Sequence, residues 1–128
     1  MKASDLFDKA VVALKSSEAL LALGDMDGAC NRAYYAMFDA ARGALLATGS
    51  VTDLNKIKTH AGLISSFSLH LVKTGLLPIE SGKSINKVED LRLVADYQGD
   101  EVSREKVVWA LSEAKSFVAS LQQFNTTA

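Results

Sequence analysis

The sequence has one cysteine, one proline and no long apolar run, and each scarcity excludes a class of protein. The lone thiol, Cys30, excludes an internal disulfide and a zinc site built on several cysteines, and it fits a reducing compartment. Apolar runs such as residues 19–23 are far shorter than the roughly 20 residues that a membrane-spanning helix needs. An early acid, Asp5, and the amphipathic pattern after it exclude a signal peptide. The sequence therefore predicts a soluble, cytoplasmic protein.

An excess of positive charge is also missing. Lysine and arginine together number 14 and aspartate and glutamate 15, which leaves a formal net charge of -1. A protein that binds nucleic-acid backbones tightly and without sequence preference usually carries a strong positive field. Any contact with RNA must therefore be local or must be completed by a partner subunit.

The sequence contains enough hydrophobic residues to form one core. The chain has 128 residues, of which 48% are hydrophobic, and this predicts a single domain spanning residues 1–128. Alternating β-branched patterns are nearly absent, whereas apolar residues recur at helical spacing. Five helices are predicted, over residues 5–23, 25–48, 56–73, 84–97 and from 103 onward. Short connections between them favour an all-α, up-and-down antiparallel bundle of four to five helices.

Local signals predict where these helices begin and end. Caps are expected at Ser4, at Asp25 or Asp27, at Ser84 and near Ser103. Stops are expected at Gly24, Gly49, Gly75 and Gly99, and the last residues, 125–128, are expected to fray. Pro78 is expected to prevent the third helix from resuming. Residues 76–83 would then form the longest linker and the most mobile segment.

The apolar stripe of the first helix is predicted to contain Phe7, Ala10, Val11, Leu14 and Leu21. The second helix carries alanine on nearly every face, so it is expected to lie at the centre of the bundle, where small side chains allow close approach. Its aromatic residues, Tyr34, Tyr35 and Phe38, are interpreted as core and dimer packing, because a base-stacking platform needs exposed rings beside a basic groove.

Four segments, in order, resemble the HEPN (Higher Eukaryotes and Prokaryotes Nucleotide-binding) domain. Residues 32–42, Arg-Ala-Tyr-Tyr-Ala-Met-Phe-Asp-Ala-Ala-Arg, with Ala-Leu-Leu at 44–46, are similar to its second helix. Residues 58–63, Lys-Thr-His-Ala-Gly-Leu, with Phe67, are similar to its third helix, and residues 72–75 to the end of that helix. Residues 92–97, Arg-Leu-Val-Ala-Asp-Tyr, match the family's Arg-x-x-Ala-Asp-Tyr signature.

The resemblance implies a helical bundle that forms a homodimer and is often paired with a minimal nucleotidyltransferase, as toxin and antitoxin. In the nuclease branch it also implies an Arg-x4-6-His element, two copies of which cleave RNA without metal across the dimer. This chain lacks that histidine: positions 97–99 are Tyr, Gln and Gly, and no histidine follows His70. Aspartate, with a pKa near 3.9, is a poor substitute for imidazole as a proton donor at neutral pH. The chain therefore matches an Arg-x3-Asp-Tyr branch, to which nuclease activity does not simply carry over.

Three residues of the predicted fourth helix are the candidate catalytic site: Arg92, Asp96 and Tyr97. The spacing of four residues places Arg92 and Asp96 on one helix face. Arg92 could bind a phosphate that Asp96 and Tyr97 orient, or the three could form an ion pair and a helix end of structural value only. The resemblance also raises the question whether Tyr97 is modified by nucleotidyl transfer.

Candidate RNA- or nucleotide-binding residues are Arg92, His60 and Arg32. His60 could meet a phosphate, although a hydrogen bond to a neighbouring helix is the interpretation favoured here. His60 and His70 lie too far apart along one helix to chelate one ion, so no metal and no cofactor are expected. Arg32 and Asp39, seven residues apart, could form a polar patch. Two interpretations are open for the basic residues around the fourth helix: a local basic region or a solvated mixed face. These residues are Lys83, Lys87, Arg92 and Arg104.

The leading hypothesis is a homodimeric interaction or regulatory module, the toxin-like half of a pair with a nucleotidyltransferase-type protein. One alternative is a metal-independent ribonuclease that uses Arg92 with Asp96 and Tyr97. Another is a bundle that binds a small nucleotide.

Overall fold

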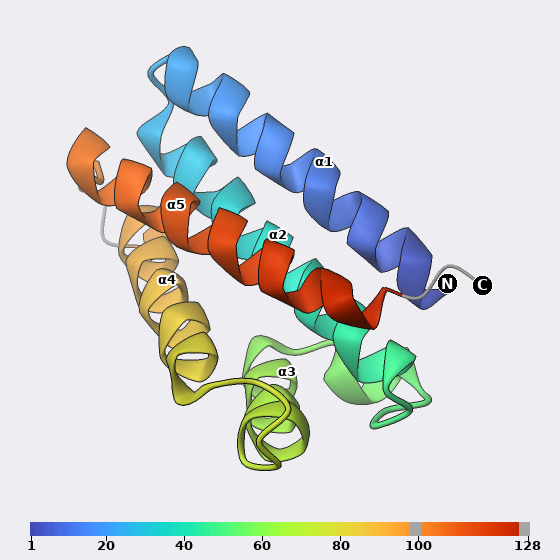
Figure 1. Cartoon of the computed structure of the whole chain (residues 1–128). Coiled ribbons are helices and arrows are strands. Elements are labelled where there is room, and N and C mark those ends of the chain that lie inside the picture. Colours follow the sequence, from blue (N-terminus) through green and yellow to red (C-terminus); the bar gives the residue numbers. More distant parts are fainter. Residues whose placement is uncertain (98–100, 126–128) are drawn as a thin grey trace.

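The computed structural model describes residues 1–97 and 101–125, and within these ranges it contains helices and no strand. The all-α class predicted from the sequence is confirmed. The elements are α1 (Ala3–Ala22), α2 (Met26–Ala47), the 3₁₀-helix η1 (Leu54–Ile57), α3 (His60–Phe67), the π-helix η2 (Ser68–Val72), α4 (Ile79–Tyr97), α5 (Arg104–Leu121) and the 3₁₀-helix η3 (Gln122–Phe124). The long helices α1, α2, α4 and α5 run up and down, and the short α3 lies at one end (Figure 1).

α1 and α2 form a tight antiparallel hairpin. Gly24 ends α1 with a φ of 86°, a left-handed conformation that glycine adopts without strain. The Asp25 carboxylate then accepts a 2.8 Å hydrogen bond from the Gly28 backbone N–H and caps α2. The prediction of Gly24 as a stop is confirmed, and of the two predicted caps, Asp25 and Asp27, the structure uses Asp25.

The predicted start of α1 was wrong by two residues. Ser4 lies inside the helix, and the residue before the helix is Lys2. The Asp5 carboxylate accepts a 2.9 Å hydrogen bond from the Lys2 backbone N–H, so an acid of the first turn, and not Ser4, supplies the side-chain bond at this helix start. Val11 was also misplaced in the apolar stripe: it is 38% exposed, and Leu6 is buried instead.

α2 occupies the centre of the bundle, as its alanines predict. It contacts each of the other four α-helices. Its alanines at 29, 33, 36, 40, 41 and 44 are fully buried. Small side chains on several faces let neighbouring backbones approach closely, and larger residues such as Phe7 and Leu45 fill the space between them.

Residues 56–73 were predicted to form one continuous helix, and this is wrong. η1 ends before Lys58, and the Thr59 side chain accepts a 3.0 Å hydrogen bond from the Gly62 N–H to begin α3 anew. α3 passes at Ser68 into η2, a π-helical stretch in which each turn is wider. Gly75, with a φ of 83°, then ends the segment as predicted.

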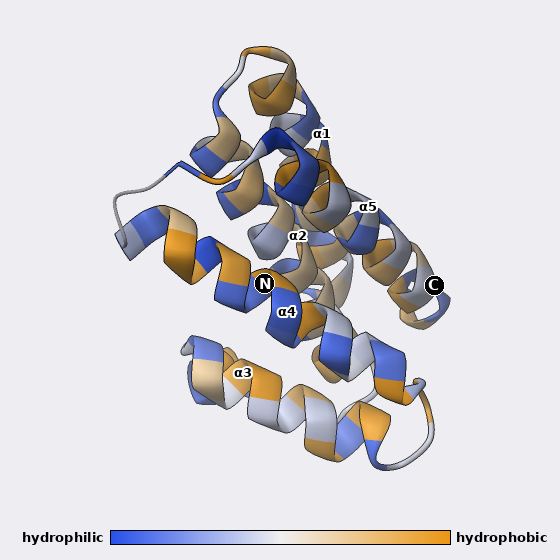
Figure 2. Ribbon diagram, turned by 90° about the vertical axis from the view of Figure 1, so that its left-hand side faces the viewer, coloured by the Kyte–Doolittle hydropathy of each residue, from blue (hydrophilic) through white to orange (hydrophobic). Residues whose placement is uncertain are grey.

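α4 begins at Ile79, five residues before the predicted cap Ser84. The third helix does not resume before Pro78, as predicted, but Pro78 also starts α4. Its carbonyl accepts a hydrogen bond from the Ser81 N–H, and its missing N–H is no loss at a helix start. Most of the predicted linker 76–83 is therefore helical. α3 and α4 lie side by side (Figure 2).

α5 begins where it was predicted, because the Ser103 hydroxyl accepts from the Lys106 N–H. Its apolar face includes Phe117, which packs against Phe67 of α3 with ring centroids 5.3 Å apart. The predicted stop at Gly99 and most of the predicted fraying at 125–128 lie outside the described residues. Within residues 1–97 and 101–125, none of the helices combines the length and the apolar character that a membrane-spanning segment requires.

Candidate functional site

α4 presents Arg92 toward the interior of the bundle, where two carboxylates of the same helix hold it. Arg92 Nη1 donates to Asp96 Oδ2 at 2.7 Å, one turn further on. Arg92 Nε and Nη2 donate to the two oxygens of Glu89, at 3.1 and 3.3 Å, one turn before. The pair with Asp96 is the one that the spacing predicted. The forked contact with Glu89 was not predicted, although i,i+3 spacing also allows it.

Two tyrosines of α2 cover the Arg92 guanidinium. Its Cζ atom lies 4.9 Å from the ring centroid of Tyr34 and 5.8 Å from that of Tyr35. Arg92 is only 4% exposed as a result. A guanidinium over an aromatic face is held by the ring quadrupole, and more strongly when water is excluded. Arg92 thus links α4 to α2.

His60 joins the same cluster from the first residue of α3. Its Nδ1 lies 2.8 Å from the Tyr34 hydroxyl oxygen, and its Nε2 lies 3.4 Å from that of Tyr35. Its ring also packs against Phe38, with centroids 5.2 Å apart. The interpretation of His60 as a residue that bonds a neighbouring helix is confirmed. We call Arg92, Glu89, Asp96, Tyr34, Tyr35 and His60 the Arg92 cluster.

Within the Arg92 cluster, the pKa shifts of Tyr34 and Arg92 keep these two groups in fixed charge states. Burial raises the pKa of Tyr34 far above its ordinary value, and the nearby Glu89 carboxylate raises it further. The Tyr34 hydroxyl therefore stays protonated and can donate to His60 Nδ1. Burial alone would lower the pKa of Arg92, but the bonds to Glu89 and Asp96 outweigh it and raise that pKa. Arg92 cannot act as a proton donor or acceptor.

The charge of the Arg92 cluster does not favour a phosphate. One guanidinium stands between two carboxylates, so the ion-paired group carries a net negative charge. An incoming phosphate would have to displace a carboxylate from a guanidinium that is almost fully buried. The contacts therefore fit the structural interpretation of Arg92 and Asp96 better than the phosphate-binding one.

Tyr97, the third predicted catalytic residue, does not join this cluster. It is the last residue of α4 and is 75% exposed. Asp96 is the intermediate case, since its side chain is 26% exposed while it is bonded to Arg92. The structure thus brings together Arg92 and Asp96 but leaves Tyr97 facing outward.

Arg32 touches the edge of the cluster. Its Cζ lies 5.1 Å from the Tyr35 ring centroid, and its guanidinium donates to the side chain of Asn31. Arg32 and Asp39 both line a shallow groove between α1 and α2, but Asp39 pairs with Arg42 at 3.4 Å. Burial raises the pKa of Asp39, which Arg42 partly offsets. The predicted Arg32–Asp39 patch is a shared groove without a bond between the two.

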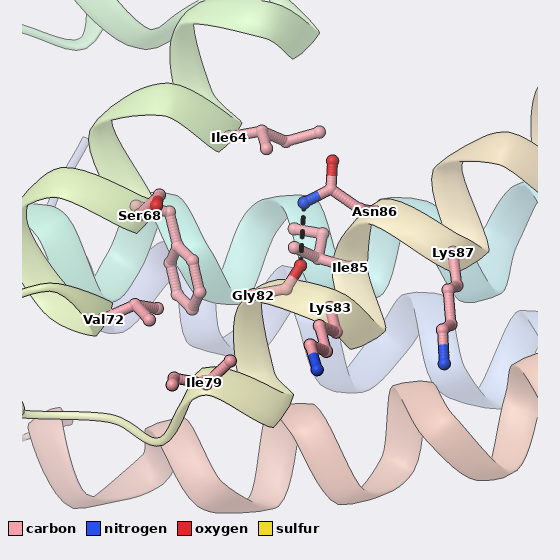
Figure 3. Close-up of a pocket in the computed structure, with 10 residues that line it drawn as sticks. Ile64, Ser68, Val72, Ile79, Gly82, Lys83, Ile85, Asn86 and Lys87 are labelled. Atoms are coloured by element: carbon pink, nitrogen blue, oxygen red, sulfur yellow. Dashed lines mark hydrogen bonds between the residues drawn. The ribbon is translucent and has the colours of Figure 1, made fainter.

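The predicted basic region is not a cluster. Arg92 is buried, and Arg104 lines a different groove, with residues of α1. Only Lys83 and Lys87 share a surface, the rim of an apolar groove of about 350 Å³ between α3–η2 and α4 (Figure 3). Ile64, Val72 and Ile79 point into this groove, and Asn86 donates to the Gly82 carbonyl within it.

Two further kinds of catalytic group were considered: a cysteine nucleophile and a bound metal ion. Cys30 is fully buried, and burial raises the pKa of its thiol to about 11, so it is no nucleophile at neutral pH. Among the described residues, no three His, Cys, Asp or Glu side chains lie close enough to hold a metal ion.

Comparison with known proteins identifies relatives of this chain. A UPF0332 protein of Gloeobacter violaceus is 33% identical over 122 residues, which cover 94% of this chain and 93% of that protein. Two proteins of Methanocaldococcus jannaschii are named as candidate toxins. MJ0605 is 37% identical over 92 residues, which cover 72% of this chain and 65% of that protein. MJ0142 is 30% identical over 120 residues, which cover 93% of this chain and 78% of that protein. The HEPN domain family matches residues 3–124. The chain is therefore a member of the HEPN domain family.

Proposed function

We propose that this protein is the toxin-like member of a two-protein system, a homodimer that binds a nucleotidyltransferase-type partner. The observation that carries the proposal is the contrast between two residues near the end of α4. Arg92 is committed to contacts inside the protomer, whereas Tyr97, five residues later, is 75% exposed. An outward tyrosine at a helix end can be reached by another protein, and the buried guanidinium cannot.

The toxin-named relatives support the same role. Both are similar to this chain over more than two thirds of its length. A name describes those proteins only, so the role needs a direct test in cells.

The test has two parts. The chain is expressed from an inducible promoter with and without the product of the neighbouring gene, and growth and co-purification are measured. We expect growth arrest that the second protein relieves, and a complex that survives gel filtration. Scattering of the purified chain should give twice the 13.7 kDa of one protomer. A monomer that captures no partner and does not slow growth would refute the proposal.

Tyr97 offers a sharper variant. Tyr97→Phe removes one exposed hydroxyl and keeps the ring, so folding should be unaffected. If the partner modifies this hydroxyl by nucleotidyl transfer, the variant should still arrest growth and should no longer be relieved. Tyr35→Phe, which removes a half-buried hydroxyl, serves as the matched control.

The ribonuclease hypothesis instead requires a conformational change at Arg92. It requires Arg92 to leave both carboxylates and both tyrosine rings to reach RNA. RNA cleavage by the purified chain that disappears in Arg92→Lys, with the fold retained, would favour it over the interaction role.

A further inference from the structure

A second surface of α4 has the chemistry of a nucleotide site, on a side of the helix away from Arg92. Lys87, Asp90, Leu91 and Val94 follow one another at helical spacing and line a groove against Lys106 and Trp109 of α5. Its volume of about 410 Å³ lies in the range of small-molecule sites. We call these six residues the Trp109 groove.

Trp109 is the feature that needs explanation. It is the chain's single tryptophan and it is 39% exposed, although an indole ring would normally be among the more buried side chains. Among the described residues, no aromatic ring stacks on it and no cation lies over its face. The ring is therefore available to a planar ligand.

The charges around Trp109 complement a nucleotide. Lys87 and Lys106 form no ion pair with any described residue, and these two cations of the groove outnumber its one carboxylate, Asp90. Leu91 and Val94 supply an apolar wall for a base, and the Asp90 carboxylate can accept hydrogen bonds from ribose hydroxyls. A base has a π-face for stacking and carries its phosphate on a flexible arm, which suits an aromatic ring between lysines.

We infer that the Trp109 groove binds a ribonucleotide unit, free or within single-stranded RNA, with the base stacked on Trp109 and the phosphate at Lys87 and Lys106. An exposed tryptophan also occurs at protein interfaces, but the two unpaired lysines beside it favour a phosphate-bearing ligand. This inference goes beyond the proposed toxin-like role and is tested on the purified chain alone, so either can fail without the other.

The single tryptophan makes the test direct, because all indole emission comes from this groove. The chain is titrated with AMP, with octa-adenylate RNA and with inorganic polyphosphate of matched charge. We expect saturable quenching by AMP and the RNA, since stacking changes the indole environment, and none by polyphosphate. An emission unchanged at millimolar AMP and RNA, or equal quenching by polyphosphate, would overturn the inference.

Variants separate the two kinds of contact. Lys87→Gln and Lys106→Gln should each weaken RNA binding and reduce its salt dependence by about one phosphate contact. Lys15→Gln, an exposed lysine of α1 with the same charge change, should leave affinity within about twofold. Equal effects from all three would mean that net charge alone attracts the RNA, and would contradict the assignment.

Stacking itself is tested by replacing the ring. Binding of dye-labelled RNA, followed by anisotropy, should weaken roughly 5- to 100-fold in Trp109→Ala and less in Trp109→Phe. Circular dichroism checks that both variants fold. Unchanged affinity in the folded Trp109→Ala variant would refute the site. A wild-type emission that shifts with protein concentration alone would show that a second copy of the chain fills the groove instead.

Discussion

The α1–α2 hairpin and the segment from η1 to α4 are held together in different ways. α1 and α2 are two unbroken helices whose contact is mostly alanine against apolar side chains, with the Ser17 hydroxyl bonded to the Ala29 carbonyl. The segment 54–97 passes through 3₁₀-, α- and π-helix before α4. Its link to α2 includes the ion pairs, aromatic faces and hydrogen bonds of the Arg92 cluster.

The α1–α2 hairpin and the segment from η1 to α4 should therefore tolerate different kinds of substitution. Apolar packing depends on volume and is spread over many contacts, so it fails through cavities or crowding. A polar cluster depends on a few directional contacts, and the loss of one member leaves its partners buried and unsatisfied.

The largest effect is expected in the apolar half. Phe7 is 1% exposed and packs between α1 and α2. Phe7→Ala should lower the free energy of unfolding by about 3–5 kcal/mol, through lost burial and a residual cavity. Urea unfolding followed by circular dichroism measures it. Val12→Ala, 61% exposed on the same helix, is the control and should change stability by less than about 0.5 kcal/mol.

The next effect tests the polar half. Arg92→Met keeps most of the side-chain volume but leaves Glu89 and Asp96 without their cation. Breaking a buried pair costs roughly 3–5 kcal/mol, and the partial exposure of both carboxylates reduces the expected loss to about 2–3 kcal/mol. Arg104→Met, at an exposed position, provides the comparison. Equal stability of the two variants would show that Arg92 does not hold α4 to α2.

A smaller loss is expected from Tyr34→Phe. It removes the hydroxyl 2.8 Å from His60 Nδ1 and leaves that nitrogen without its donor, at a cost of about 1–2 kcal/mol. Tyr35→Phe removes a weaker contact at 3.4 Å and should cost less than about 0.5 kcal/mol. The reverse order in thermal or urea unfolding would argue against the assigned role of the Tyr34–His60 bond.

The smallest expected effect is a gain in stability, whereas the preceding substitutions lower it. Gly82 lies inside α4, and a Cβ there would meet Val72 of η2 at 3.6 Å, an ordinary contact. Gly82→Ala should stabilise the chain by about 0.5–1 kcal/mol through helix propensity. Gly62→Ala in α3 should destabilise it, because its Cβ would lie 2.7 Å from the Thr59 hydroxyl that caps the helix. Differential scanning calorimetry of both variants decides whether the signs differ.

The sequence predicted the regular half better than the irregular one, for a physical reason. Caps such as Asp25 and Ser103 and the stops at Gly24 and Gly75 act on their own neighbours, so a local pattern contains the information. The break at Thr59 and the π-turn at Ser68 depend on what α3 packs against, which periodicity does not reveal. Pro78 was read only as a barrier to the third helix, and its second role as the start of α4 was missed, because proline both ends and starts helices.

The site shows the same division. The Arg92–Asp96 pair followed from i,i+4 spacing, and the bond of His60 to a neighbouring helix was foreseen without its partner. The packing of the Arg92 guanidinium against the Tyr34 and Tyr35 rings could not be predicted, because these residues are far apart in the sequence and no local spacing relates them. Trp109 was overlooked, although a lone tryptophan three residues after Lys106 was a local signal for an aromatic beside a cation.

One spectrum can test the central claim that the Arg92 cluster is closed to ligands while the surface of α4 is open to them. In a ¹⁵N-labelled sample, the Nε–H of Arg92, assigned by its loss in Arg92→Lys, and the indole N–H of Trp109 are followed together during titration with octa-adenylate RNA. We expect the Trp109 signal to shift and saturate while the Arg92 signal stays in place. A shift of Arg92 with Trp109 unmoved would contradict the account and would return the Arg92 cluster to the role of a phosphate site.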